Sequence, residues 1–242
     1  MLSKIIRNDI MKMSRINNIT AGFVTSELDK KDIFKLRYDV MVRDTQTFPK
    51  KHYCIHNDEF KDEYDEHPST KHYLVRKNGI AVASCRLIDR NKVEFEAEKF
   101  KWFPVAKELE KTHTNAINCV EPTRVVVCKS VRKSHISVFM LADNLLYIHD
   151  NKFESVLGLV NSSASSLINH YQKFMPSLLP LSKWPFSVNE FIEGRSCAAF
   201  NLYIGTSEEQ RKQFMYSTIF KCFLYYNFLY YKHGNYTNED LK

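Results

Sequence analysis

Two short clusters in the sequence combine acidic and basic side chains beside apolar, strand-like segments. The first contains Asp62 and Asp65, with Arg86 following after a predicted strand. The second contains Glu121 and Arg124 and leads directly into three consecutive valines. A carboxylate or a guanidinium is costly to bury unless it is paired with an opposite charge. We therefore expect these charges, which stand at the mouths of core strands, to build a site.

The aspartates of the first cluster suit cation binding. Asp62 and Asp65 are three residues apart, so in a loop or a first helical turn they can face the same way. Converging carboxylates bind a metal ion or an organic ammonium, but no ordered calcium-loop pattern is present and we predict no metal. The alternative is a solvated acidic loop, which composition favours because Glu59, Glu63 and Glu66 lie alongside.

The second cluster offers a candidate general base. Glu121 precedes an apolar strand, and burial of a carboxylate favours its protonated form, which tunes it for proton transfer near neutral pH. The alternative role for Glu121 is a structural ion pair with Arg124 or Arg86, and the two roles can coexist. Thr123 can donate or accept a hydrogen bond at this strand edge, or it is present as a β-former.

A basic group follows the same predicted strand and precedes a predicted helix. It consists of Lys129, Arg132 and Lys133. A strand-to-helix turn offers free N–H groups and a favourable helix dipole, so it suits a phosphate. The alternative is an ordinary solvated loop. The turn contains no glycine, which excludes a Walker-type or dinucleotide-binding loop.

Local signals predict the elements that must position these residues. Ser26 and Asp29 resemble a capping box, which predicts a helix with an apolar face and with Arg37 close to that face. Arg37 either extends its head to water from the edge of the stripe or points into a cleft. Asn78-Gly79 predicts a hairpin between strands at 71–76 and 80–88.

The remaining pattern alternates helices with strands. The continuous valines 125–127 in a strand at 119–128 suggest burial on both faces. The other predicted elements are helices at 138–151 and 162–174 and strands at 155–159 and 198–204. Together they predict an α/β or α+β domain with a mixed central sheet flanked by helices. We assign residues 1–25 to an N-terminal extension, 26–212 to the domain, and 213–242 to an aromatic C-terminal helix and tail.

Composition narrows the partners and the compartment. The chain has 242 residues with 35 Lys and Arg against 28 Asp and Glu, a net charge of +7. Without a long basic tract or a nucleic-acid motif, this excess favours an acidic protein or an anionic lipid over nucleic acid. The six cysteines show no C-x-x-C pair and the N-terminus resembles no signal peptide, which together predict the cytoplasm. The segment 214–231 predicts a buried or interfacial helix, with peripheral membrane contact as the alternative.

Several segments, in this order and spacing, resemble the acyl-homoserine-lactone synthases, the autoinducer synthases of bacterial quorum sensing. The segments are Leu36–Val40, Glu59–Asp65 with Tyr73-Leu74, Arg86-Leu87, Phe103-Pro104, Glu121–Arg124 and Gly194–Glu209. The resemblance implies the GNAT fold of the N-acetyltransferases. The chain departs from the family pattern at two places. Met41 stands where the family usually has a Phe. The family also has a Trp soon afterwards, and the nearest aromatic residue in this chain is Phe48.

The resemblance also implies a reaction and roles for the site residues. An acyl group would pass from the phosphopantetheine of an acidic acyl carrier protein to the amine of S-adenosylmethionine, and the product would lactonise, without a metal or a tightly bound cofactor. Glu121 and Thr123 would be catalytic. Substrate binding would fall to Arg37, Asp62, Asp65, Arg86, Phe103 and Arg124, and contact with the carrier protein and its phosphopantetheine to Lys129, Arg132 and Lys133.

Two alternative functions stay open. The first is an N-acyl amino acid synthase of the same fold and with the same acyl donor, which the departures at Met41 and Phe48 favour. The second is a non-enzymatic module that binds a carrier protein or a membrane surface, which the aromatic segment 214–231 and the positive charge favour.

Overall fold

The computed structural model describes residues 4–6, 8, 18–48, 50, 54–89, 118–132, 134–161, 178–180, 186–188, 195–221 and 224. Structural statements below concern these residues. The predicted helix at 162–174, Phe103 and Lys133 lie outside them.

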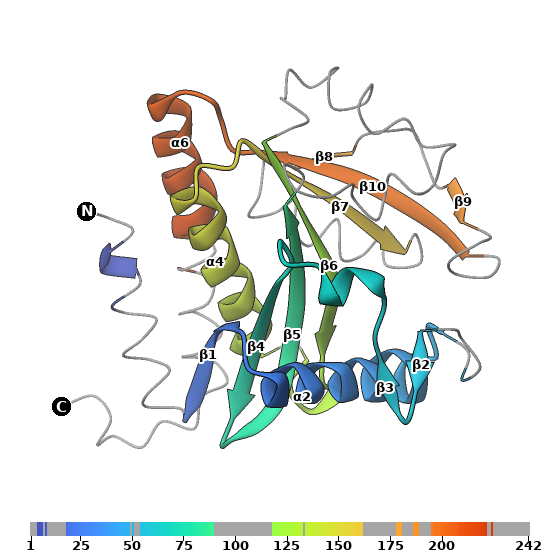
Figure 1. The fold of residues 1–242 in the computed structure, drawn as a ribbon. Helices are drawn as coiled ribbons and strands as arrows, with labels where there is room; N and C mark the ends of the chain where they lie inside the picture. The colour runs from blue at the N-terminus through green and yellow to red at the C-terminus, as the bar shows by residue number, and fades with distance from the viewer. Residues whose placement is uncertain are drawn as a thin grey trace.

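A mixed β-sheet forms the centre of the fold, as the sequence predicts (Figure 1). The strand order is β1-β4-β5-β6-β7-β10-β8, and β9 also pairs with β10. All pairings are antiparallel except that of β6 with β7, which is parallel. The strands are β1 (Ile19–Val24), β4 (Lys71–Lys77), β5 (Ile80–Asp89), β6 (Cys119–Val127), β7 (Ser155–Asn161), β8 (Leu178–Pro180), β9 (Phe186–Val188) and β10 (Arg195–Tyr203).

Helices cover both faces of the sheet (Figure 1). Helix α2 (Glu27–Tyr38) and the π-helical turn η1 (Asp39–Asp44) pack on one face, where Leu36 contacts Val126. Helix α4 (His135–Asp150) covers the other face together with α6 (Glu208–Phe214) and the π-helical turn η6 (Met215–Ile219). The main apolar core lies between α4 and the sheet, where Leu146 contacts the cluster that contains Leu87 and Val120.

Local chemistry explains the helix and the hairpin that the sequence predicts. The Ser26 hydroxyl accepts a hydrogen bond from the backbone N–H of Asp29 at 3.1 Å and so caps α2. Asn78 and Gly79 both have positive φ, at 51° and 79°, which the tight turn between β4 and β5 requires. These two signals fix where α2 begins and where the chain turns from β4 into β5, while a register shift between Val75 and Arg76 sets the pairing further along the hairpin.

The expected burial of the valine run on both faces holds for Val126 and, in part, for Val127, but it is wrong for Val125. Val126 is buried against α2, whereas Val125 is 48% exposed. The preceding Arg124 has a positive φ of 51°, and the register between β5 and β6 shifts between Ser84 and Arg86. Such an irregularity bends a strand and resets the alternation of its side chains, so one valine of the run turns outward.

Two predicted boundaries also change. Residues 19–24, which the sequence analysis assigned to an extension, pair with β4 as the strand β1, so the sheet begins before residue 26. The predicted loop at 45–58 ends in a short ribbon, in which β2 (Ile55–His56) pairs with β3 (Glu59–Phe60). Pairing over a long sequence distance decides the first change, and no local signal reports it. The second is a local hairpin, whose turn residues Asn57 and Asp58 both have positive φ.

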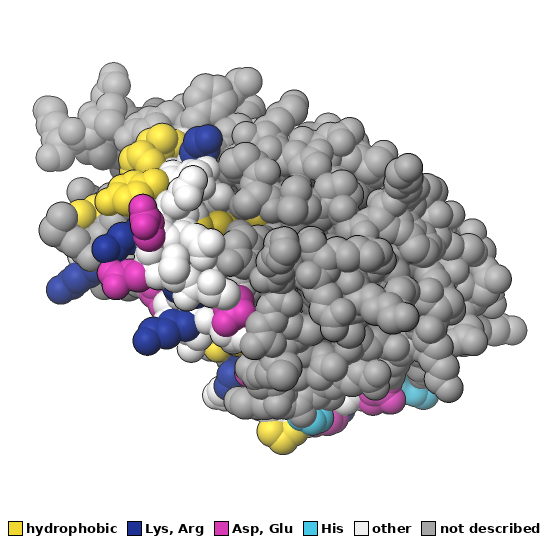
Figure 2. Space-filling model, turned by 90° about the horizontal axis from the view of Figure 1, so that it is seen from above, with side chains coloured by type: hydrophobic (Ala, Val, Ile, Leu, Met, Phe, Trp, Pro, Cys, Tyr) yellow, Lys and Arg dark blue, Asp and Glu magenta, His cyan; other side chains and the backbone are white. Residues whose placement is uncertain are grey.

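The predicted C-terminal aromatic helix begins as part of the core. Phe214, Met215 and Ile219 are buried in the cluster that surrounds α4, while Tyr216 is exposed. Within the described part of the chain, no helix has both the length and the apolar character needed to cross a membrane. On the face drawn in Figure 2, basic and acidic side chains of the described residues lie interspersed, so these side chains form no patch of a single charge there.

One long-range contact closes the end of α4 and gives a test of the fold. The Arg211 guanidinium donates to the carbonyl oxygens of His149, Phe153 and Gly205. We expect Arg211→Met to lower the free energy of unfolding by about 1.5–3 kcal/mol, because these carbonyls lose a charged donor. Urea denaturation measures this value. The control Lys212→Met removes an exposed ion pair with Glu208 and should leave stability unchanged.

Candidate active site

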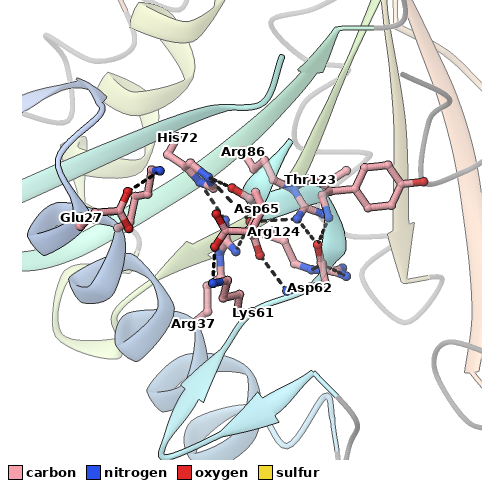
Figure 3. Close-up of polar contacts among 12 residues, drawn as sticks. Glu27, Arg37, Lys61, Asp62, Asp65, His72, Arg86, Thr123 and Arg124 are labelled. Atoms are coloured by element: carbon pink, nitrogen blue, oxygen red, sulfur yellow. Dashed lines mark hydrogen bonds and ion pairs between the residues drawn. The ribbon is translucent and has the colours of Figure 1, made fainter. Parts of the chain in front are cut away.

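Two aspartates and three arginines from distant parts of the chain form one ion-pair network on the α2 face of the sheet (Figure 3). Asp65 Oδ1 accepts from Arg37 at 2.8 Å and from Arg86 at 2.9 Å. Asp62 Oδ1 accepts from the same nitrogen of Arg86, and Asp62 Oδ2 accepts from Arg124 Nε at 3.0 Å and Nη2 at 2.7 Å. Arg86 therefore bridges the two aspartates at the centre of the network.

A short 3₁₀ turn, η2 (Glu63–Glu66), orients both aspartates. The carboxylate of Asp62 accepts from the backbone N–H of Tyr64 at 3.0 Å, and the backbone N–H of Asp62 donates to Asp65 Oδ2 at 2.9 Å. This reciprocal capping box locks the two carboxylates toward the sheet. Their side chains are 5% and 0% exposed, so the predicted solvated acidic loop is wrong for these residues.

Aromatic rings hold the two buried arginines from the side. The Arg37 guanidinium lies 5.5 Å from the centre of the Phe34 ring, and that of Arg86 lies 5.3 Å from the Tyr64 ring. Each is a cation–π contact, which adds attraction without needing a further hydrogen-bond acceptor. Arg37 and Arg86 are fully buried, so Arg37 points into the interior and does not extend to water as one alternative had it.

Arg124 joins this network to the loop that follows η1. Its guanidinium lies 5.3 Å from the Phe60 ring and 5.8 Å from the Phe48 ring, and these two rings contact each other. Phe48, one of the two departures from the family pattern, thus belongs to a buried apolar cluster under this loop, with Tyr38 and Cys54. Arg124 is the arginine of the network with the greatest exposure, 9%.

The network sets the charge states of its members. Burial alone would raise the pKa of Asp62, but the guanidinium groups of Arg124 and Arg86 outweigh it and lower that pKa. The pKa of Asp65 is likewise lowered, because Arg37 and Arg86 outweigh its burial. Both aspartates are therefore ionised near neutral pH. Burial lowers the pKa of Arg37, while Asp65 opposes this shift and keeps the guanidinium paired.

The second cluster joins the first on the same face. Thr123 Oγ1 accepts from Arg86 Nε at 2.8 Å, and Thr123 lies opposite Arg86 in the register of β5 and β6. Glu121 is two residues earlier on β6, opposite Ile88, and is fully buried. Because alternate residues of a strand share a face, Glu121 lies on the side of Thr123 and the network. Both clusters of the sequence thus meet at one place.

Sequence reasoning missed one member of the site, His72 on β4. Its Nε2 lies 3.1 Å from the backbone carbonyl of Asp65, and its Nδ1 lies 3.5 Å from Arg37 Nη2. His72 stands opposite Arg86 in the hairpin register, and directly opposite residues lie on one face of a sheet. The turn at Asn78-Gly79 alone would pair His72 with Cys85, and a register shift between Val75 and Arg76 brings it opposite Arg86. No local signal in the sequence reports this shift, which is why His72 was missed.

The predicted basic group lies apart from the network, in the turn between β6 and α4. Lys129 is exposed in a single 3₁₀ turn, η4 (Lys129–Val131). Arg132 donates from Nε to the carbonyl of Val127 at 3.0 Å and forms an ion pair with Asp44 at the end of η1. Arg132 therefore ties η1 to this turn. No group of described His, Cys, Asp and Glu side chains has an arrangement that could hold a metal ion.

Strands β6 and β7 separate soon after they begin to pair. Their parallel ladder contains only Cys119 with Ser155 and Val120 with Val156, and beyond it the strands diverge (Figure 1). At the first pair of the ladder, the Cys119 thiol and the Ser155 hydroxyl are 2.6 Å apart and buried. The segment of β6 that carries Thr123 and Arg124 borders this separation.

Comparison with known proteins identifies the fold. No protein-family model matches the chain, and no curated protein matches it. Among solved structures, FeeM, an N-acyl amino acid synthase from uncultured soil microbes, is similar with a TM-score of 0.60 at 8% identity, over 85% of this chain and 97% of that one. The acyl-homoserine-lactone synthase LasI gives 0.56 at 12% identity, over 77% of this chain and 89% of that one.

A third similar structure is BjaI, a CoA-dependent acyl-homoserine lactone synthase solved with SAM and isopentyl-CoA. Its TM-score is 0.55 at 15% identity, over 84% of this chain and 92% of that one. Sequence identities this low establish the fold alone. The chain has the GNAT-like α/β fold of these synthases, a mixed sheet flanked by helices, as the resemblance implied.

The buried network predicts a large and pH-dependent loss of stability in Asp65→Asn. The variant leaves Arg37 and Arg86 buried with one anionic partner fewer, and we expect unfolding to cost about 3–5 kcal/mol less at pH 7. The folded-state pKa of Asp65 is lowered. Its stabilisation is therefore complete above the unfolded value of about 3.9 and is lost as the pH falls through the folded value.

Urea denaturation between pH 7 and pH 3 tests this prediction. The acid-side loss of stability should be shallower in Asp65→Asn than in the parent. Glu66→Gln is the control, because Glu66 forms an exposed ion pair with Lys61 and should cost far less. Equal losses of unfolding free energy in the two variants at pH 7 would contradict the prediction that the buried ion pairs of Asp65 matter more than an exposed one.

Proposed function

We propose that the chain is an N-acyltransferase that transfers an acyl group from the thioester of an acyl carrier protein to the amine of S-adenosylmethionine and forms an N-acyl-homoserine lactone. One observation carries the proposal. The strand β6, which presents Glu121 and Thr123 beside the arginine network, is also the strand that separates from β7. A carboxylate base and a strand edge thus lie next to each other, which acyl transfer from a thioester requires.

The donor side of the reaction uses the separation of β6 and β7. A phosphopantetheine arm carries amide groups, which hydrogen-bond to an exposed strand edge as an added strand would. A backbone N–H near Val125 then stabilises the oxyanion that forms on the thioester carbonyl. Val125 is half exposed and follows the positive φ of Arg124, which supports a local opening of β6 at this point.

The acceptor side uses Glu121 and the network. Glu121 takes a proton from the acceptor amine, the nitrogen attacks the thioester carbonyl, and the thiol of the carrier leaves with a proton. The carboxylate of the acylated product then attacks its own γ-carbon and displaces methylthioadenosine, which closes the lactone. Arg124, the network arginine with the greatest exposure, is the group we assign to the substrate carboxylate.

The two aspartates take a different role from the one that the resemblance implied. All four of their carboxylate oxygens accept hydrogen bonds from arginine or from backbone N–H groups. A sulfonium or ammonium ion would have to displace an arginine to reach them. We therefore assign Asp62 and Asp65 to positioning Arg37, Arg86 and Arg124.

This saturation of the aspartates favours a second candidate function, an N-acyl amino acid synthase with the same donor. A free amino acid brings a carboxylate and no sulfonium, so it needs a guanidinium and no further anionic partner. Arg124, paired with Asp62 through two nitrogens and flanked by Phe48 and Phe60, lies at the partly exposed end of the network.

Product analysis tests the proposed function through Glu121→Gln. We expect cells that express the chain to accumulate an N-acyl-homoserine lactone, detected by mass spectrometry of the culture extract. Turnover by the purified variant should fall by about 10²-fold or more, because the general base is lost. Glu209→Gln, on the exposed first turn of α6, is the matched control and should retain full activity.

The products separate the candidates. N-acyl amino acids without a lactone would move the assignment to the second function. Assays with purified acylated carrier protein and with acyl-CoA as donors, each with both acceptors, test activity independently of the donors that the host supplies. If none of these combinations gives product, the acyltransferase proposal is wrong.

The exposed lysine in the turn between β6 and α4 leads to a prediction of how salt affects the reaction with the carrier-protein donor. We propose that exposed Lys129 meets the acidic carrier protein, in keeping with the net charge of +7. Lys129→Ala should lower kcat/KM for acyl carrier protein at low ionic strength and flatten its salt dependence. It should leave the reaction of a small acyl-thioester donor unchanged. Lys31→Ala, on α2, is the control, and equal effects on both donors would contradict carrier docking at Lys129.

A further inference from the structure

His72 is a buried titratable side chain that the proposed reaction does not use. It is 2% exposed, on β4, with the edge of its ring against Phe34 at a centroid distance of 6.0 Å. It contacts two members of the network from different elements, Arg37 on α2 and the backbone of Asp65 in η2. A side chain in this position links the helix to the turn that carries the aspartates.

The contacts of His72 select one form of its imidazole. A guanidinium can only donate hydrogen bonds, so Nδ1, which faces Arg37 Nη2 at 3.5 Å, has to accept. The proton of a neutral ring therefore sits on Nε2, which donates to the carbonyl oxygen of Asp65 at 3.1 Å. Only the neutral ring with its proton on Nε2 satisfies both neighbours.

Protonation of His72 would set it against this environment. A proton on Nδ1 would face the N–H groups of Arg37, and the added charge would lie near Arg86 as well. Against these stand the carboxylate of Asp65, 3.9 Å from Nε2, and that of Asp62, the N-cap residue of η2. Burial first, and then Arg37, lower the pKa of His72, while the carbonyl and carboxylate of Asp65 oppose the shift. The ring is therefore neutral at neutral pH.

We infer that His72 is a positioning residue, whose neutral imidazole holds Arg37 on α2 against the η2 turn and so fixes the aspartates that orient Arg86 and Arg124. When the ring gains a second proton, its hydrogen bond with Arg37 is lost and the network loosens. The site is then assembled only where His72 is neutral. The activity consequence of this inference rests on the proposed function, whereas the tautomer and the stability consequence do not.

The tautomer is measured directly by long-range ¹H–¹⁵N NMR of the full chain labelled with ¹⁵N-histidine. The signal of His72 is identified by its loss in His72→Asn. At pH 7 we expect a neutral ring with its proton on Nε2. A protonated ring, or a proton on Nδ1, would overturn the inference whatever reaction the chain performs.

Two substitutions separate positioning from packing. His72→Asn keeps an acceptor near the place of Nδ1 and cannot be protonated, whereas His72→Phe keeps the ring shape and removes both hydrogen bonds. The exposed His56→Asn is the control. Because the folded pKa of His72 lies below the unfolded value of about 6.5, parent stability should fall as the pH drops below 6.5. This decline should be smaller in His72→Asn and unchanged in His56→Asn.

The same variants give an activity readout. We expect His72→Asn to remain within about threefold of the parent kcat/KM at pH 8. It should also lose the decline that the parent shows as the pH falls through the lowered folded-state pKa of His72, since a side chain that cannot titrate needs no neutral form. His72→Phe should lose more than tenfold at every pH while its near-UV circular dichroism stays native. An unchanged acid decline in His72→Asn, in stability and in activity, would overturn the inference. If the parent itself shows no activity, the proposed function is wrong, and the NMR and stability results alone then test the role of His72.

Discussion

The fold is organised around one guanidinium, that of Arg86. This guanidinium is fully buried. It donates to Asp62 and Asp65 through one nitrogen and to Thr123 through another. A charge removed from water costs several kcal/mol unless excellent geometry compensates it. The elements that supply this compensation, η2 and β6, have to meet β5 at one point, and α2 joins them through Arg37 and Asp65. The network therefore joins α2, η2, β5 and β6 at one place on the sheet.

The network and the gap between β6 and β7 share the strand β6, and this couples two otherwise separate regions. Thr123 and Arg124 belong to the network, and the same residues follow the point where β6 leaves β7. The positive φ at Arg124 turns this guanidinium toward Asp62, and Val125 is left exposed. An irregularity that costs free energy in an ordinary strand here serves both sides of the site.

The sequence predicts those features that depend on neighbouring residues. The capping Ser26 and the turn at Asn78-Gly79 act locally, so α2 and the β4–β5 hairpin follow from them. The state of the aspartates does not follow from local composition, since Asp62 meets its partners Arg86 and Arg124 across 24 and 62 residues. Only the resemblance to a family brought these residues together beforehand. The exposure of Val125 escaped prediction because a single dihedral angle resets the strand.

Acid acts on this network through its histidine. The pKa values of Asp62 and Asp65 are lowered by their arginines, so both stay ionised through the range in which histidine side chains titrate. His72 resists protonation because it is buried beside Arg37, and a proton that it gains adds positive charge next to the arginines of the network. The aspartates cannot compensate, since they are fully ionised. In this arrangement, carboxylates hold the arginines in place, and the neutral imidazole of His72 lies beside them. The arrangement is therefore sensitive to acid at His72.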